Sequence, residues 1–259
     1  MISKPAQDQV VALRNIRLSY GPVQVLDDVS MTVPRGEICV LAGGNGIGKT
    51  SVIRLLSGAA RPDSGTATIF GLPPGQAKIG LVWQNTYASL YPWLSALENA
   101  ALPLRLQGIN RKERRRRILD MCRDLGFDLP LERPPYEMSG GEQQKTCMLR
   151  ALASECELLL LDEPWNNVDF DSSLDLMLHI QEINARTALT TIIVSHSPEF
   201  SAFVAHAVIP MRTKPVRLME TDRIRIECPY RNPRPRKWLF DAQFREQVEA
   251  LKGSLGGQQ

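Results

Sequence analysis

One segment constrains the fold of this chain more than any other, the glycine-rich stretch GGNGIGKT at residues 43–50. It fits the spacing G-x-x-x-x-G-K-[ST], follows the continuous apolar run Ile38–Ala42, and precedes a helical pattern over Thr50–Ser57 that Gly58 ends. A strand, a glycine loop and a helix in this order gather backbone N–H groups and the positive end of a helix dipole around one point. The segment therefore predicts a phosphate-binding site in an α/β fold.

Two side chains of this loop carry specific expectations. Lys49 would reach the β- and γ-phosphates of a nucleotide, and the Thr50 hydroxyl would coordinate Mg²⁺. An incidental Gly-Lys-Thr in a structural turn is the alternative, which the flanking strand and helix patterns disfavour. The residues predicted to bind nucleotide here are Gly43, Gly44, Asn45, Gly46, Ile47, Gly48, Lys49, Thr50 and Ser51.

A second apolar run ends in two carboxylates. Leu158–Leu161 leads directly into Asp162 and Glu163. A parallel strand that is buried on both faces needs such a run, and ligands in open α/β sheets collect at the carboxyl ends of the strands. We expect Asp162 to hold the metal ion and Glu163 to be the general base that polarises the attacking water. An apolar run that ends in two carboxylates is weak evidence for a metal site by itself. Together with the phosphate loop it becomes strong evidence.

The rest of the chain alternates strand and helix patterns, which is typical of a parallel sheet covered by helices on both faces. Strands are also predicted over Val10–Leu18, Val25–Val33, Thr66–Phe70, Lys78–Trp83 and Thr190–Ser195. Helical patterns are predicted over Ser95–Gln107, Arg111–Leu125, Gly140–Ala153 and Asp171–Ala185, with breaks at Pro103, Gly126 and Pro134-Pro135. Residues 87–154 are interpreted as a mostly helical insertion. Residues 215–259, with a helix near Phe240–Leu251, are interpreted as a separate C-terminal attachment.

Composition limits the setting in which the chain works. Its 259 residues can form a large core, and a net charge of +3 is too small to indicate nucleic-acid binding. The longest apolar runs fall far short of the roughly 20 residues of a membrane-spanning helix, and the N-terminus lacks the apolar region of a signal peptide. The five scattered cysteines form no CxxC pair, which predicts reduced, mostly buried thiols in a cytosolic protein.

The segment SGGEQQ at residues 139–144, which opens the third inserted helix, resembles the signature of the ABC ATPases. A serine and two glycines at a helix N-terminus form a second anion site. In the family this segment of one subunit reaches the γ-phosphate that the other subunit binds. The resemblance therefore implies paired cassettes, with nucleotide contacts from Ser139, Gly140, Gly141 and Glu142.

Further elements of the ABC family follow in order. Tyr20 matches the aromatic residue that stacks on adenine, Gln84 matches the glutamine that senses metal and nucleotide, and His196 matches the switch histidine that contacts the γ-phosphate. The resemblance thus implies ATP as the nucleotide and Mg²⁺ as its metal. The residues assigned to catalysis are Lys49, Glu163 and His196, and those assigned to the metal are Thr50, Gln84 and Asp162.

The resemblance covers about residues 10–212 and implies an α/β P-loop NTPase fold. Such a fold has a RecA-like core, an antiparallel β subdomain and an inserted α-helical subdomain. Asn166 and Asn167 stand where the family commonly has Ser-Ala, in a loop that touches the opposite subunit. The expected divisions are a core in 1–86 and 155–214, a helical signature subdomain in 87–154 and a C-terminal extension in 215–259.

Three kinds of ABC protein compete. A short single cassette favours the ATP-binding subunit of an importer, peripheral at the cytoplasmic face of the inner membrane. Its partners would be a transmembrane permease, a second cassette (a copy or a paralogue) and, indirectly, an extracytoplasmic solute-binding protein. The alternative is a non-transport ABC ATPase that acts on nucleic acid or ribosomes, which would usually carry two cassettes, a long coiled coil or a strongly basic patch. Glu163 argues against a third kind, a sensor that does not hydrolyse ATP.

Two segments indicate a subgroup of importers. Tyr91–Asn99 and the tail Pro229–Arg236 resemble the ATPases of nitrate, sulfonate and taurine importers, which implies a small anionic solute. The aromatic residues of Tyr91–Leu94 would receive an amphipathic helix of the permease, unless they pack in the core of the insertion. Arg111–Arg117 holds six basic residues in seven. We interpret this run as a solvated helix face, with phosphate contact at a membrane surface or on nucleic acid as the alternatives. No direct contact with nucleic acid is expected.

Overall fold

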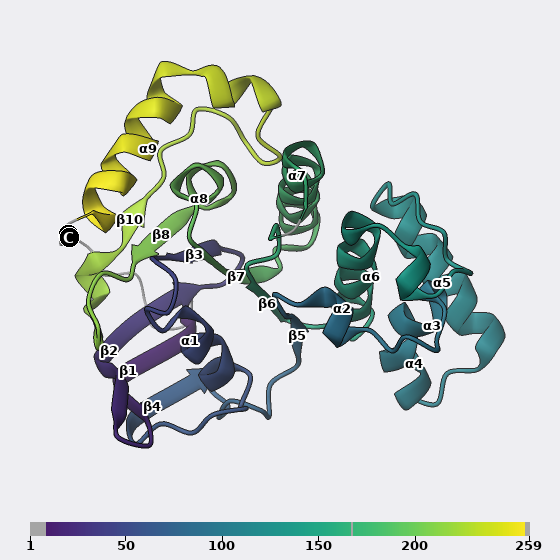
Figure 1. The fold of residues 1–259 in the computed structure, drawn as a ribbon, viewed down its shortest axis with the longest axis horizontal. Helices are drawn as coiled ribbons and strands as arrows, with labels where there is room; N and C mark the ends of the chain where they lie inside the picture. Colours follow the sequence, from purple (N-terminus) through teal and green to yellow (C-terminus); the bar gives the residue numbers. More distant parts are fainter. Residues whose placement is uncertain (1–8, 167, 257–259) are drawn as a thin grey trace. The chain divides into compact units, whose positions relative to one another are not determined.

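The computed structural model describes residues 9–166 and 168–256, so Asn167 lies outside the described residues. The chain forms two compact units. The first comprises residues 1–77 and 180–259, and the second comprises residues 78–179. Figure 1 shows the two stretches of the first unit in purple to blue and in green to yellow.

A four-stranded sheet in the first unit is built around a long hairpin. Strands β1 (Gln9–Tyr20) and β2 (Val23–Pro34) pair antiparallel, with Tyr20 opposite Val23 across the turn. The order β4-β1-β2-β9 is completed by β4 (Ser64–Ile69) and by β9 (Val216–Leu218), which runs parallel to β2. The predicted antiparallel β subdomain is thus present. It includes one strand from beyond the expected C-terminal boundary.

The first unit also contains the strands that carry the phosphate loop. β3 (Ile38–Ala42) pairs parallel with β7 (Thr190–Ser195) and with β8 (Ala207–Pro210), and the short β10 (Ile224–Arg225) pairs antiparallel with β8. Every residue of β3, β7 and β8 is buried. The apolar runs predicted a parallel sheet with both faces covered, and the structure confirms it.

Helices of the first unit lie at both ends of the chain. α1 (Lys49–Leu56) follows the phosphate loop, and α8 (Pro198–Val204) and α9 (Ala242–Leu255) come from the C-terminal part. Two 3₁₀ turns, η3 (Glu220–Asp222) and η4 (Arg236–Phe240), complete the unit. Helix α8 and strands β8 to β10 had not been predicted, because each is too short to show a period.

The C-terminal residues are an integral part of the first unit rather than a separate attachment. Arg234 is only 3% exposed and donates hydrogen bonds of 2.7–2.8 Å to three carbonyl oxygens at the C-terminal end of α8. Trp238 is fully buried, with its ring centroid 6.0 Å from that of Phe203 and 4.9 Å from that of Phe244. An arginine that binds the last carbonyls of a helix also neutralises the negative end of its dipole.

The second unit is a parallel strand pair with a set of helices. β5 (Ile79–Val82) pairs with β6 (Leu158–Asp162). Its helices are α2 (Thr86–Ser89), α3 (Ala96–Ala100), α4 (Leu102–Leu106), α5 (Arg111–Asp124), η2 (Pro135–Glu137), α6 (Gly140–Leu152) and the first part of α7 (Phe170–Thr187). Within residues 9–166 and 168–256, no helix is both long and apolar enough to cross a membrane.

The helical segment predicted over Ser95–Gln107 is interrupted, as predicted, although the break lies at Ala101 rather than at Pro103. The segment forms two one-turn helices, α3 and α4, which meet at Ala101. Pro103 stands in the first turn of α4, where its missing N–H is harmless. In a continuous helix the Pro103 ring would clash with a carbonyl of the preceding turn, so the chain ends α3 and starts again.

All five cysteines are free thiols, and Cys39, Cys122 and Cys147 are buried. Burial raises the pKa of the Cys39 thiol to about 12 and that of the Cys147 thiol to about 11. Both therefore stay protonated and unreactive. The prediction of mostly buried thiols is confirmed.

Candidate nucleotide-binding site

The phosphate loop starts where β3 ends and is held by the neighbouring strand. The Gly43 amide donates a 3.1 Å hydrogen bond to the carbonyl oxygen of Ser195, the last residue of β7. Gly46 and Gly48 have φ angles of 71° and 123°, which side chains other than glycine rarely adopt. The glycine spacing therefore reflects backbone angles that this turn requires.

Lys49 points back into the loop. The side chain is 6% exposed, and its ammonium donates to the carbonyl oxygens of Gly43 at 2.8 Å and Gly44 at 3.0 Å. These bonds hold a buried positive charge between the end of β3 and the start of α1. An ammonium in this place is suited to binding phosphate oxygens.

The N-terminus of α1 has no side-chain cap. Gly48 is the N-cap residue, and no side chain bonds the amides of the first turn there. A Cβ atom on Gly48 would lie 2.9 Å from Cγ1 of Val25 in β2, so the loop passes closely against the hairpin. A helix start without a side-chain cap is typical of helix ends that bind phosphate.

The structure brings two more predicted residues into the first unit with the loop. His196 is exposed and follows β7, whose residue Ser195 is the register partner of Ala42, the last residue of β3. His196 and Gly43 therefore leave adjacent strands at the same edge. Tyr20, 41% exposed, ends β1 in the hairpin whose second strand packs on Gly48.

The carboxylates and the glutamine lie together at one edge of the second unit. Val82 of β5 is the register partner of Leu161 of β6. Gln84, two residues past β5, and Asp162, the last residue of β6, therefore both lie at the carboxyl ends of paired strands. Asp162 and Glu163 are 2% and 4% exposed. Glu163 has φ of +47°, a left-handed conformation that costs about 1–3 kcal/mol and is often found at functional sites.

The signature segment opens α6 in the second unit through a capping box. The Ser139 side chain accepts a 3.3 Å bond from the Glu142 amide, and the Glu142 carboxylate accepts a 2.7 Å bond from the Ser139 amide. Ser139 and Gly140 are exposed. A hollow of about 90 Å³ lies beside them, lined by Ser139, Gly141, Glu142, Gln144, Lys145, Val168, Ser172 and Leu176.

Sequence reasoning missed three polar residues of the second unit. Gln144 is 3% exposed, and its Nε2 has no hydrogen-bond partner within the described part of the chain. Asp169 caps α7 by accepting from the Ser172 amide, which, with the Ser172 hydroxyl, lowers the pKa of its carboxyl. Asn99 is fully buried and bonds the backbone of the loop from Tyr91 to Ser95. The N-cap at Asp169 could have been predicted, because an aspartate before a helical pattern is a common helix start. The burial of Gln144 and the hydrogen bonds of Asn99 depend on how the chain folds and could not.

Comparison with known proteins agrees with this geometry. The family model for ABC transporters matches residues 26–166, more than half of the chain. The chain is 31% identical over 210 residues to the spermidine/putrescine import ATP-binding protein PotA of Nitratidesulfovibrio vulgaris, covering 79% of the chain and 56% of that relative. It is 32% identical over 224 residues to the Fe(3+) ions import ATP-binding protein FbpC of Rhizobium etli, covering 85% and 63%. The chain thus spans about three fifths of the length of these curated relatives.

Solved structures show the same fold. A bacterial ABC transporter cassette, solved as a dimer, matches with a TM-score of 0.70 and 25% identity over 77% of this chain and 93% of that one. A post-hydrolysis dimer of a cassette with ADP and Pi matches with a TM-score of 0.73 at 24% identity, over 84% and 99%. The fold is the α/β fold of an ATP-binding cassette, as predicted, and the chain belongs to the ABC transporter family.

Proposed function

We propose that this chain binds and hydrolyses ATP and serves as the ATP-binding subunit of an ABC importer. The observation that carries the proposal is Lys49, a buried ammonium that two loop carbonyls hold at the uncapped start of α1. An ammonium at the start of a helix, beside the amides of a glycine-rich loop, is suited to binding the oxygens of a polyphosphate.

Binding follows from the loop alone. The Lys49 ammonium would bridge the β- and γ-phosphate oxygens while the loop amides bind the same groups. Tyr20 would stack on the adenine, and its exposed ring in the hairpin beside Gly48 supports this role. The positive charge of Lys49 would also draw electrons from the bond that breaks.

The donor set fits Mg²⁺. The Thr50 hydroxyl, the Gln84 amide oxygen and the Asp162 carboxylate are the hard oxygen ligands that Mg²⁺ prefers. Across residues 9–166 and 168–256, no three His, Cys, Asp or Glu side chains converge as a protein-only metal cage. Mg²⁺ typically binds through one or two carboxylates together with substrate phosphates. When bound, it neutralises phosphate charge in the transition state.

Hydrolysis is assigned to the carboxylate and the histidine. Glu163 would accept a proton from the attacking water, and His196 would contact the γ-phosphate. The strained backbone of Glu163 and its burial support a placed, functional carboxylate. A second subunit would supply Ser139, Gly140, Gly141 and Glu142, whose segment is exposed at the start of α6.

An importer needs a surface that contacts its permease. Trp93 is 74% exposed and Tyr91 is 41% exposed, with ring centroids 5.4 Å apart. These aromatic rings are therefore available to a partner rather than packed in the core of the insertion. Asn99 fixes the backbone beneath them with four hydrogen bonds. Exposed aromatic residues on a fixed loop suit an amphipathic helix, and this contact would hold the chain at the cytoplasmic face of the membrane.

The solute is chosen by the permease and the solute-binding protein. The names of similar import proteins mention spermidine/putrescine, Fe(3+) ions and sn-glycerol-3-phosphate. The loop at Tyr91–Asn99 and the tail at Pro229–Arg236 of this chain resemble those of nitrate, sulfonate and taurine importers. We propose a small anionic solute of that kind, to be tested by uptake with the matching permease.

A non-transport role on nucleic acid is the second candidate, and the basic run is its only support. Within that run, Arg116 and Arg117 bind Glu113, and Arg116 also binds Asp120. Three of the six basic side chains of the run, Arg115, Arg116 and Arg117, are paired with carboxylates, which leaves few charges to neutralise a nucleic-acid backbone. The importer is therefore the favoured function.

The test is Glu163→Gln, which keeps the size of the side chain and removes the base. Hydrolysis should fall by about 10²–10⁴-fold, while ATP binding persists. Light scattering with Mg-ATP should then show a dimer, and Glu163→Gln combined with Ser139→Arg should stay monomeric. Hydrolysis at the wild-type rate would exclude Glu163 as the base. An inactive variant that stays monomeric with ATP would indicate that a paralogous cassette is the partner.

A further inference from the structure

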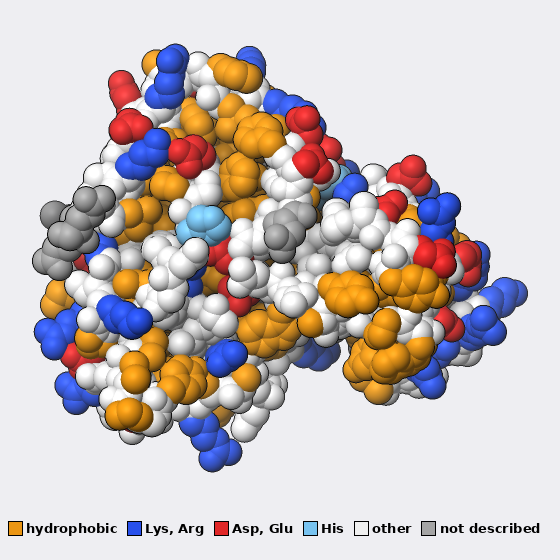
Figure 2. Space-filling view, in the orientation of Figure 1, with side chains coloured by type: hydrophobic (Ala, Val, Ile, Leu, Met, Phe, Trp, Pro, Cys, Tyr) orange, Lys and Arg blue, Asp and Glu red, His pale blue; other side chains and the backbone are white. Residues whose placement is uncertain are grey.

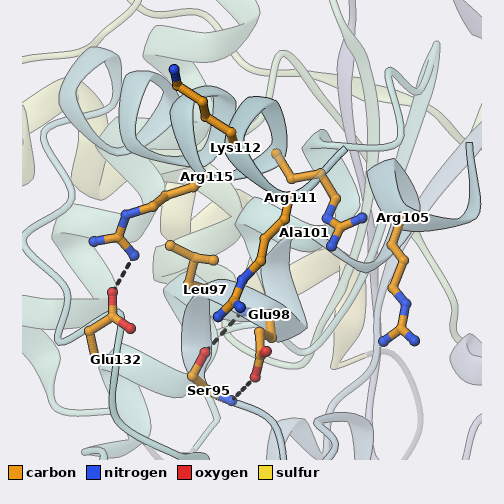
Figure 3. Close-up of a pocket in the computed structure, with 10 residues that line it drawn as sticks. Ser95, Leu97, Glu98, Ala101, Arg105, Arg111, Lys112, Arg115 and Glu132 are labelled. Carbon is orange, nitrogen blue, oxygen red and sulfur yellow. Dashed lines mark hydrogen bonds and ion pairs between the residues drawn. The ribbon is translucent and has the colours of Figure 1, made fainter. Parts of the chain in front are cut away.

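A basic cavity lies in the second unit, away from the signature segment. It has a volume of about 580 Å³ and is lined by Ser95, Leu97, Glu98, Ala101, Arg105, Arg111, Lys112, Arg114, Arg115 and Glu132. Five of these ten side chains are basic and two are acidic. Figure 3 shows Arg105 on α4 and Arg111 and Arg115 on α5 extending toward the same side of these helices, whereas Lys112 extends away from them.

Two arginines of this cavity keep their charge uncompensated. Arg115 forms an ion pair with Glu132, and Arg114 donates to the Ile109 carbonyl oxygen at 2.7 Å. The side chains of Arg105 and Arg111, in contrast, form no ion pair or hydrogen bond with any residue in 9–166 or 168–256. Glu98 is committed to the capping box of α3. The cavity therefore presents two guanidinium groups, from two helices, to a ligand.

The other side of α5 is different. Arg116 bonds Glu113 and Asp120, and Arg123 bonds Asp120 at 2.7 Å. The hydrogen bonds of Arg116 and Arg117 lower the pKa of the Glu113 carboxyl to about 2. The basic run thus has one neutralised side and one side that is open to an anion.

Exposed apolar side chains border the basic cavity. A neighbouring hollow of about 590 Å³ shares Ser95 and Glu132 with it and is lined further by Pro92, Trp93, Pro134 and Tyr136. Trp93 is 74% exposed, Tyr136 63% and Leu106 of α4 81%. In Figure 2, Lys and Arg side chains gather at the outer edge of this unit over α5, next to hydrophobic side chains. Trp and Tyr beside Arg and Lys are typical of surfaces that meet the headgroups of a bilayer.

We propose that the basic cavity binds the phosphate headgroup of an anionic phospholipid, through the guanidinium groups of Arg105 and Arg111. Guanidinium groups match phosphate oxygens in pairs of hydrogen bonds. The neighbouring aromatic and leucine side chains lie where they would reach the interfacial region of the same leaflet. The site deepens the proposed function, on which it rests for the presence of the chain at a membrane.

The experiment measures binding of the full chain to vesicles without permease, in saturating Mg-ADP so that the phosphate loop is filled. Vesicles of phosphatidylcholine are compared with vesicles of equal parts phosphatidylcholine and phosphatidylglycerol. Wild-type chain should cosediment with the second kind only, and added salt should release it. Arg105→Gln with Arg111→Gln should weaken this binding by about tenfold or more.

The matched control changes two arginines on the neutralised side of α5. Arg116→Gln with Arg123→Gln lowers the net charge by the same amount and should keep most of the vesicle binding. Arg105→Lys with Arg111→Lys keeps the charges but not the paired hydrogen bonds of a guanidinium group, so its binding should lie between that of the wild type and that of the Gln variant. A melting temperature of the Gln variant close to that of the wild type shows that the Gln variant is folded. Equal losses in the Gln variant and the control would overturn the site in favour of a general charge effect.

Two further outcomes would overturn the lipid as the ligand. Glycerol phosphate could bind in titration calorimetry, with the same dependence on Arg105 and Arg111, while vesicles do not bind. Alternatively, the Gln variant could lose binding only to membranes that contain the permease, which would assign the cavity to an acidic segment of that protein. ATP hydrolysis is measured alongside, and a lipid result with hydrolysis unchanged separates this site from the proposed function.

Discussion

The two glycine-rich segments that open helices in this molecule differ in how they are built. In the first unit the phosphate loop is held by buried polar contacts: Lys49 is 6% exposed, and Gly43 bonds the end of β7. In the second unit the signature segment is exposed, and Ser139 and Glu142 satisfy each other in a capping box. The phosphate loop is thus fixed by contacts within its own unit, whereas the signature segment is exposed on the surface of its unit.

The contrast indicates which half of a nucleotide site is organised within one chain. A buried ammonium and uncapped amides are organised in advance for phosphate, so binding requires little rearrangement. The exposed helix start gains a role only when another surface covers it. We therefore predict that substitutions in the phosphate loop weaken ATP binding by the single chain. Substitutions in the signature segment should instead weaken the association of two chains.

The largest effect is expected for Lys49→Ala. Removal of a buried, hydrogen-bonded charge should weaken ATP binding by about 2–5 kcal/mol, which is tens- to thousands-fold. Titration calorimetry on the monomer measures this. Lys145→Ala, in the helix of the signature segment, should leave the affinity of the monomer within about twofold. Equal affinities for wild type and Lys49→Ala would remove the loop from the proposed site.

Substitution of alanine for Gly48 and for Gly141 should change the free energy of unfolding in opposite directions. Gly48→Ala puts a Cβ at φ +123°, 2.9 Å from Val25 Cγ1, and should destabilise the fold by about 1–3 kcal/mol. Gly141→Ala meets nothing closer than 3.8 Å inside a helix, where alanine is better than glycine by about 0.5–1 kcal/mol. Denaturant midpoints measure both. A loss of stability in Gly141→Ala as large as that in Gly48→Ala would contradict the contrast.

The smallest expected effect concerns pH and His206, a partly exposed histidine beside the start of β3, the strand whose other end leads into the phosphate loop. His206 accepts from the Ile38 amide through Nδ1 at 2.9 Å and lies 2.8 Å from Asn232. Burial, with the charges of Arg234 and Arg225, lowers the pKa of His206 from 6.5 to about 4. The folded state therefore favours the neutral ring. The contribution of neutral His206 to the free energy of unfolding is complete above pH 6.5 and is lost as the pH falls toward 4.

The loss should be about 1–2 kcal/mol, since the ring is partly exposed. His206→Asn keeps an acceptor for the Ile38 amide, and the difference in unfolding free energy between this variant and wild type should change between pH 6.5 and 4. Glu113, in the second unit, has its pKa lowered from 4.5 to about 2, so its contribution is lost only below pH 4.5. A difference between wild type and His206→Asn that appears only below pH 4 would show that His206 is not the group that titrates.

Much of the first unit was predictable because its signals are local. The bounds of β3 and β7 agree with the prediction to the residue. β3 is a continuous apolar run that ends at a glycine-rich turn, and β7 has an apolar centre between two threonines and a serine. The loop at residues 43–50 needs glycine at positions 46 and 48 because the backbone there has positive φ angles. Such features depend on neighbours in the sequence, and a single sequence therefore contains them.

The helical insertion and the C-terminal residues were predicted less well because their contacts are distant. The Pro- and Arg-rich composition of residues 229–236 is typical of a linker, yet Arg234 bonds the end of α8, about thirty residues earlier. Similarly, the basic run at Arg111–Arg117 is one charge pattern in the sequence. Only the side-chain pairs with Glu113 and Asp120 divide it into a neutralised and an open side.

The family of this protein, the order of strands β1 to β7 and the residues of the phosphate loop can be read from the amino-acid sequence. These depend on backbone angles, hydrophobic periods and motif spacing, all of which act over a few residues. Which polar groups are buried and which charges are compensated becomes known only in the folded chain. Those depend on partners that folding brings together from distant positions: carbonyls of α8 for Arg234, and no carboxylate among the described residues for Arg105 and Arg111.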